Sequence, residues 1–170
     1  MLDKKVAELL NNQINKELYS AYIYLDMANF YADYGLDGFE NWFYIQAQEE
    51  RDHAMMIREY LKDNGHKITS EAIEKPEYTY EKPMDPLVKT LQHEKIVTGL
   101  INNIYDAAYE IKDYRTMKFL DWFVSEQMEE EKNAEDNIRK FELFGHDAKG
   151  LYSLDQEFLG RTYSAPTTAE

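Results

Sequence analysis

The 170-residue chain contains no cysteine, only seven glycines and only four prolines. Without cysteine it can form no disulfide, thiolate metal site, iron–sulfur cluster or cysteine nucleophile. The lack of disulfides fits a reducing compartment. The N-terminus leads directly into an amphipathic pattern, with no apolar stretch of signal-peptide type, and no run is long and apolar enough to span a bilayer. We therefore expect a cytoplasmic protein.

Positive charge is also scarce, because 19 Lys and Arg stand against 33 Asp and Glu, for a formal net charge of −14. Proteins that bind nucleic acid need basic patches for the phosphates, so nucleic acid is an unfavourable partner. The excess of acid has two explanations. One is an acidic, soluble surface, and the other is a set of carboxylates that attract or hold cations.

Helical periodicity dominates the chain, and no stretch shows the strict alternation of a half-buried strand. The first helical stripe is formed by Val6, Leu10, Ile14, Ala21, Leu25 and Ala28. Long helices are predicted over about 3–34, 39–64, 86–111 and 114–144, and a short fifth helix is built on Leu151, Leu154 and Phe158.

The polar segment 66–84 contains Pro76 and Pro83 and is too long for a tight turn. Such a connection lets the third helix run parallel to the second. The prediction is an all-α domain over residues 1–160, followed by a flexible C-terminal tail over 161–170. The domain is a four-helix bundle with one long crossover between helices 2 and 3 and a short fifth C-terminal helix.

An acid interrupts the inward apolar stripe of each long helix near its middle; these acids are Glu17, Glu50, Glu94 and Glu130. His53 follows Glu50 by three residues, and Gln127 precedes Glu130 by three, so each pair shares a helix face. At roughly 1.5 Å per residue, the four acids lie within about one helical turn of a common level.

A single acid on an apolar helix stripe is more often an outward-facing residue whose helix face was misassigned than a metal ligand. A single inward histidine is more often a hydrogen-bonded core residue than a ligand. Five such residues at one level favour a metal site, since two divalent cations would offset four buried carboxylates. Oxygen ligands with few imidazoles favour iron or manganese over copper, and zinc is also permitted.

At these residues the chain resembles the ferritin family, specifically its prokaryotic non-haem members. The resemblance covers nearly the whole chain. It rests on Glu17-Leu18-Tyr19-Ser20 with Tyr24, Gln48-Glu49-Glu50 with His53, His93-Glu94, the segments 122–127 and 129–131, Gly150-Leu151-Tyr152, and Asp155 with Glu157.

The resemblance implies a ferroxidase centre that oxidises Fe(II) to Fe(III) with O2 or H2O2. In such a centre Glu17, Glu50 and His53 bind one iron. Glu50 also bridges to a second iron, which is held by Glu94 and Glu130.

The resemblance also implies roles for the surrounding residues. Gln127 would add a hydrogen bond, and Tyr24 would be a hydrogen-bond or one-electron donor, although by itself it reads as a core tyrosine whose hydroxyl needs a partner. Glu49, Glu126 and Glu129 would form a third iron site that shares Glu130, whereas their spacing alone is equally typical of a solvated face.

Ferric oxide-hydroxide would then collect inside a hollow 24-subunit shell, as the resemblance implies. Tyrosines expected to be exposed and compatible with subunit contacts include Tyr31, Tyr34, Tyr78 and Tyr80.

The chain departs from close relatives at two points. Bacterioferritins bind haem through a methionine directly after the second-helix glutamate ligand. Arg51 stands there, so no haem is expected. The segment that lines the iron-access pores of animal ferritins corresponds to 116–121, which offers only Asp121.

From the residues alone, two alternatives stay open. One is a catalytic di-iron or di-manganese oxidoreductase without a mineral store, and the other is a structural bundle without metal.

Overall fold

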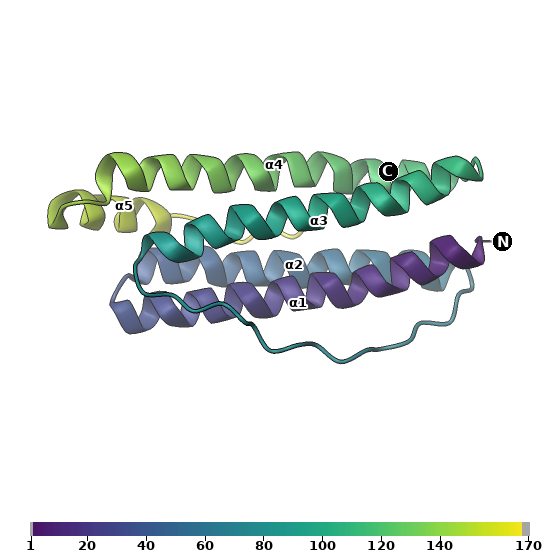
Figure 1. Ribbon diagram of the computed structural model, residues 1–170, viewed down its shortest axis with the longest axis horizontal. Coiled ribbons are helices and arrows are strands. Elements are labelled where there is room, and N and C mark those ends of the chain that lie inside the picture. Colours follow the sequence, from purple (N-terminus) through teal and green to yellow (C-terminus); the bar gives the residue numbers. More distant parts are fainter. Residues whose placement is uncertain (1, 168–170) are drawn as a thin grey trace.

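Four long helices form a bundle in the computed structural model, which describes residues 2–167 (Figure 1). They are α1 (Lys4–Tyr34), α2 (Asp37–Asp63), α3 (Met84–Glu110) and α4 (Tyr114–Phe144), and α5 (Ala148–Leu159) packs at one end. The predicted all-α fold is confirmed, and every long helix begins and ends within two residues of its predicted bounds. No helix within residues 2–167 combines the length and low polarity needed to cross a membrane.

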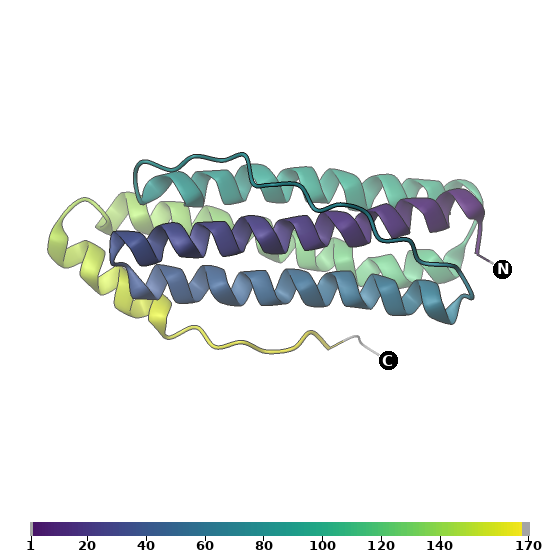
Figure 2. The same cartoon turned by 90° about the horizontal axis from the view of Figure 1, so that it is seen from below.

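The crossover between α2 and α3 runs back along the bundle, so α3 is parallel to α2 as predicted (Figure 2). Polar side chains of α1 hold this segment in place. Asn11 exchanges two hydrogen bonds with the backbone of Thr69, and Asn15 donates to the carbonyl oxygen of Ala72 at 3.0 Å. The crossover therefore covers one side of α1.

Side chains and glycines at the helix ends satisfy the free backbone groups there. The Asp3 carboxylate accepts from the backbone N–H of Lys5 at the start of α1, and Asp113 accepts from Thr116 at the start of α4. Gly35 ends α1 with φ +80°, a left-handed conformation that glycine adopts without strain.

The start of α2 is capped from α5 rather than from its own neighbours. Asp155 Oδ1 accepts from the backbone N–H groups of Gly38 and Phe39, at 2.8 and 3.1 Å. A Cβ on Gly38 would lie 1.7 Å from the Asp155 carbonyl oxygen, so only glycine allows the two helices to approach this closely. This contact positions α5 against the end of the bundle.

The interior consists of two hydrophobic cores, one toward each end of the bundle. The first is mainly aliphatic and includes Leu10, Ile57 and Ile101. The second is rich in aromatic residues and includes Phe39 and Phe43. Buried polar residues lie between the two cores; we call them the polar belt, and its members are Glu17, Gln46, Glu50, His53, Glu94, Gln127 and Glu130.

One sequence-based expectation about exposure is wrong. Tyr31 is fully buried rather than exposed, because its ring stacks on Phe39 and Phe43 and its hydroxyl donates to the Pro83 carbonyl oxygen at 2.6 Å. Leu25, one of the apolar residues whose spacing predicted the first helix, is 38% exposed. Of the other tyrosines expected on the surface, Tyr34 is 52% exposed, whereas Tyr78 and Tyr80 are half-buried.

The predicted C-terminal tail lies partly outside the described residues, because the structure describes 161–167 but not 168–170. Arg161 bonds to Glu49 and Tyr163 bonds to Asp52, so the described part contacts α2. The predicted flexibility of the tail stays a prediction.

Candidate metal centre

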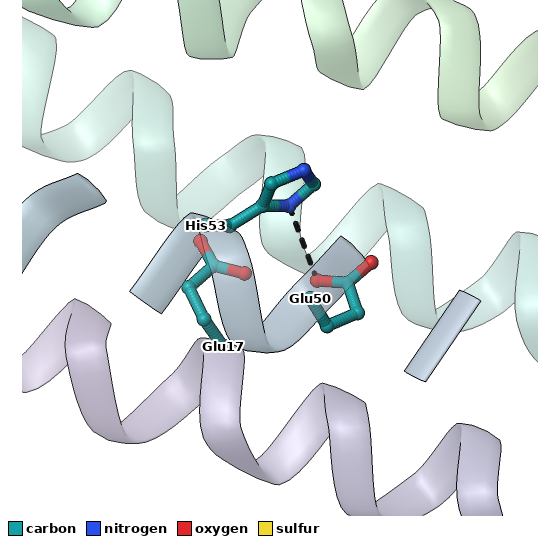
Figure 3. A group of neighbouring side chains, drawn as sticks. All are labelled: Glu17, Glu50 and His53. Atoms are coloured by element: carbon teal, nitrogen blue, oxygen red, sulfur yellow. Dashed lines mark ion pairs between the residues drawn. The ribbon is translucent and has the colours of Figure 1, made fainter. Parts of the chain in front are cut away.

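Glu17 of α1 and Glu50 and His53 of α2 point toward one another at the level of the polar belt (Figure 3). One ligand atom from each of the three residues lies within 4.8 Å of the other two. His53 Nδ1 is 3.5 Å from Glu50 Oε2, and all three residues are at most 2% exposed. The separations leave room for an ion between two oxygens and one nitrogen.

Glu17 shows how well this group fits a cation. Gln13, one turn earlier on α1, donates to Glu17 Oε1 at 2.9 Å. Within the described part of the chain, no hydrogen-bond partner reaches Glu17 Oε2, although this oxygen is buried. A buried carboxylate oxygen without a partner is costly, and a metal ion at this position would satisfy it.

Glu94 of α3 and Glu130 of α4 complete the ring of acids, at 1% and 5% exposure. Gln46 connects the two halves of the belt, since its Nε2 donates to Glu130 Oε1 at 2.8 Å and to Glu50 Oε1 at 3.3 Å. Gln127 Nε2 donates to Glu94 Oε2 at 3.0 Å. The four carboxylates predicted to share one level are therefore all buried in the belt, where Gln46 links Glu50 to Glu130 and Gln127 contacts Glu94.

Tyr24 belongs to the aromatic core, where its side chain is completely buried, and its hydroxyl donates to Glu94 Oε1. Burial, followed by the charge of Glu94, raises the pKa of Tyr24 well above its ordinary value. The phenol therefore stays protonated and remains a donor. This contact supplies the partner that a core tyrosine hydroxyl needs, and it also places Tyr24 next to the candidate centre.

Burial is the main reason that the pKa values of Glu17, Glu50, Glu94 and Glu130 lie above their ordinary value. Repulsion between the carboxylates adds to this effect: Glu50 raises the pKa of Glu17, and Glu94 raises those of Glu50 and Glu130. Without a cation, it is therefore unfavourable for all four carboxyl groups to be ionised at once. Divalent cations would relieve both causes at once.

The acids predicted to form a third site lie at the edge of this centre. Glu49 and Glu126 are half-buried, whereas Glu129 is exposed. Glu126 Oε1 is 4.0 Å from His53 Nε2. Burial and the proximity of Glu129 raise the pKa of Glu126. The structure thus brings Glu126 close to the belt, while Glu129 faces outward.

Three polar contacts around the centre were not predicted from the sequence. Gln13 and Gln46 each lie four residues before an acid that they contact, and this helical spacing could have indicated both. Arg161 lies in the predicted tail, where no periodicity indicates a partner. Its Nη2 donates to Glu49 Oε2 at 2.6 Å, and its Nη1 donates to Gln46 Oε1 at 3.0 Å.

The fold and the site together define a class: helical bundles that hold metal ions with inward-facing acids and histidine. The ferritin-like domain model of the ferritin family matches residues 7–144. The bacterial non-haem ferritin of Campylobacter jejuni is 38% identical over 156 residues, which cover 92% of this chain and 93% of that protein. The Staphylococcus saprophyticus non-haem ferritin is 36% identical over 163 residues, which cover 96% of this chain and 98% of that protein.

Solved structures give the same result. The open-pore ferritin of the archaeon Archaeoglobus fulgidus superimposes with a TM-score of 0.92 at 39% identity, covering 95% of this chain and all of that one. A closed form of the same ferritin, engineered by mutagenesis, has a TM-score of 0.94 at 39% identity, covering 96% of this chain and 100% of that one. The chain therefore belongs to the ferritin family, among the prokaryotic non-haem ferritins.

Proposed function

We propose that the chain is an iron-storage ferroxidase that oxidises Fe(II) to Fe(III) at a two-iron centre in the polar belt. Membership of the non-haem ferritins implies iron storage. One observation carries the proposed site: four acids from four helices and one histidine meet at a single buried level, with one carboxylate oxygen lacking a protein partner within residues 2–167.

Glu17, Glu50 and His53 would bind one ferrous ion, and Glu50, Glu94 and Glu130 would bind the second. Anionic oxygen ligands favour Fe(III) over Fe(II), so bound ferrous iron becomes easier to oxidise. Two adjacent ferrous ions can give one electron each to dioxygen, which is reduced to the level of peroxide. Gln127 and Tyr24, which both donate to Glu94, would hold that carboxylate in place while the iron charge changes.

We further propose that the ferric product moves into a 24-subunit shell and hydrolyses to ferric oxide-hydroxide, releasing protons. Carboxylate ligands release ferric iron more readily than thiolates would. An apolar groove lined by Leu18, Tyr22, Leu25 and Tyr44 on α1 and α2 gives the chain a surface suited to subunit contact.

The test compares the wild type with the double variant Glu50→Ala/His53→Ala. Fe(II) is added aerobically to metal-free protein, ferric absorbance is followed, and the product is sized by gel filtration. The wild type should oxidise far more than three irons per chain and keep them soluble in a large particle, whereas the double variant should lose at least about 100-fold in initial rate, in line with the loss of metal ligands.

The matched control, Glu142→Ala/His146→Ala, removes the same residue types from two exposed positions, one in the last turn of α4 and one just beyond that helix. This control should oxidise iron at the wild-type rate. If the Glu50 and His53 variant also does so, the proposed centre is wrong. If the wild type saturates at two or three irons in a small species, storage is wrong and a di-iron redox enzyme replaces it.

A further inference from the structure

The guanidinium of Arg161, just beyond α5, makes four contacts on α2. Its Nη2 donates to Glu49 Oε2 at 2.6 Å, and its Nη1 donates to Gln46 Oε1 and to the Trp42 carbonyl oxygen, both at 3.0 Å. The guanidinium also lies over the Trp42 ring, 4.3 Å from its centroid. The Arg161 and Glu49 side chains are only about one-fifth exposed, at 21% and 19%. The guanidinium is therefore held from several directions.

We call Glu49, Glu126 and Glu129, the acids predicted to form a third metal site, the outer acids, and that predicted site the outer site. Glu49 is the least exposed of the three, and its carboxylate is already paired with Arg161. Burial raises the pKa of Glu49, whereas the charge of Arg161 and its hydrogen bond to Glu49 oppose that effect. Arginine carries its charge at every accessible pH and matches a carboxylate with its planar fork. A metal ion that takes Glu49 as a ligand must therefore displace this guanidinium or share the carboxylate with it.

We propose that Arg161 is a built-in cation that competes with metal for Glu49 and so makes the outer site fill after the two-iron centre. This inference rests on the proposed function. It assigns to the segment after α5 a role in the order of metal binding. An ion that displaces the guanidinium from Glu49 would also shift it relative to the Trp42 ring.

The experiment titrates metal-free protein with Zn²⁺, a divalent ion that does not change oxidation state, and measures binding by calorimetry. Arg161→Gln should bind the third equivalent about tenfold more tightly than the wild type, which corresponds to ~1.4 kcal/mol. The first two equivalents should change little. The matched control, Arg139→Gln, removes the same charge from an exposed position on α4 and should leave all affinities unchanged.

A fluorescence measurement follows the guanidinium itself. Trp42 and Trp122 are the two tryptophans of the chain, so in a Trp122→Phe background Trp42 is the reporter. Its emission should change on the third equivalent of Zn²⁺ and not on the first two. A variant that merely misfolds would not bind metal more tightly, so a gain in affinity separates competition from a structural role.

Three outcomes are distinguishable. A tighter third equivalent in Arg161→Gln together with a change in Trp42 emission supports the inference. Normal binding of the first two equivalents, with an unchanged third or a silent Trp42, overturns the inference and leaves the proposed function standing. A wild type that does not bind the first two equivalents overturns the proposed function and the inference with it.

Discussion

Replacing Glu130 by glutamine should stabilise the metal-free protein while weakening its metal binding. Glu130 is buried, and the charges of Glu94 and Glu50 raise its pKa further above the ordinary value of 4.5. Glutamine has nearly the same shape and carries no charge. Its amide oxygen can still accept the hydrogen bond that Gln46 donates at 2.8 Å. The substitution therefore removes the repulsion and keeps the packing.

The size of the effect follows from the link between pKa and stability. Each pH unit by which folding raises the pKa of an acid costs ~1.4 kcal/mol above the folded pKa. Since the pKa of Glu130 is raised well above its ordinary value, Glu130→Gln should be more stable than the wild type at pH 8 by more than the ~0.5 kcal/mol spread of surface substitutions. For a domain of this size, each kcal/mol corresponds to about 2–4 °C in Tm.

The pH dependence gives the sign of the effect independently. The penalty on ionised Glu130 is complete above its folded pKa and disappears as the pH falls through that value toward 4.5. The advantage of the variant should therefore be largest at pH 8 and should shrink toward pH 5. With Zn²⁺ present, the wild type should be more stable than Glu130→Gln, because it binds Zn²⁺ more tightly and gains more stability from binding.

The assay is thermal unfolding of chelator-treated protein at equal concentrations, at pH 5 and pH 8, with and without Zn²⁺. Glu135→Gln makes the same change at an exposed position one turn further along α4 and should stay within about 0.5 kcal/mol of the wild type. If Glu130→Gln is no more stable than the wild type at pH 8, or if Zn²⁺ stabilises both equally, the carboxylates do not converge as described.

Two further predictions concern single contacts. Asp155→Ala should cost about 1–2 kcal/mol because it removes the cap of α2. Hydrogen exchange of peptides 37–43 and 148–159 should then be roughly tenfold faster, and unchanged exchange would contradict this capping role. Tyr24→Phe removes a hydrogen bond that lowers the pKa of Glu94, so protons should compete better with metal. Zn²⁺ affinity should fall about tenfold at pH 6 and less at pH 8; an equal loss at both would contradict the reasoning.

The helices and the level of the acids could be predicted because both depend on local periodicity. A spacing of three or four residues puts side chains on one face, and short turns put neighbouring helices in register. Tyr31 could not be placed in the same way, since its burial depends on Phe39 and Phe43, which belong to another helix. The contacts of Arg161 could not be predicted for a related reason: this residue lies outside any helix, and its partners are more than a hundred residues earlier in the chain.

The division of the interior into two cores has a consequence for folding cooperativity. The aliphatic core and the aromatic core are separated by a belt whose acids repel one another when no metal is bound. Hydrophobic contact is therefore weakest at the middle of the bundle, where the two halves would otherwise stabilise each other. Two metal ions, one held by α1 and α2 and the other by α2, α3 and α4, would link the four helices at this level. The bound iron would then also act as a crosslink at the centre of the bundle.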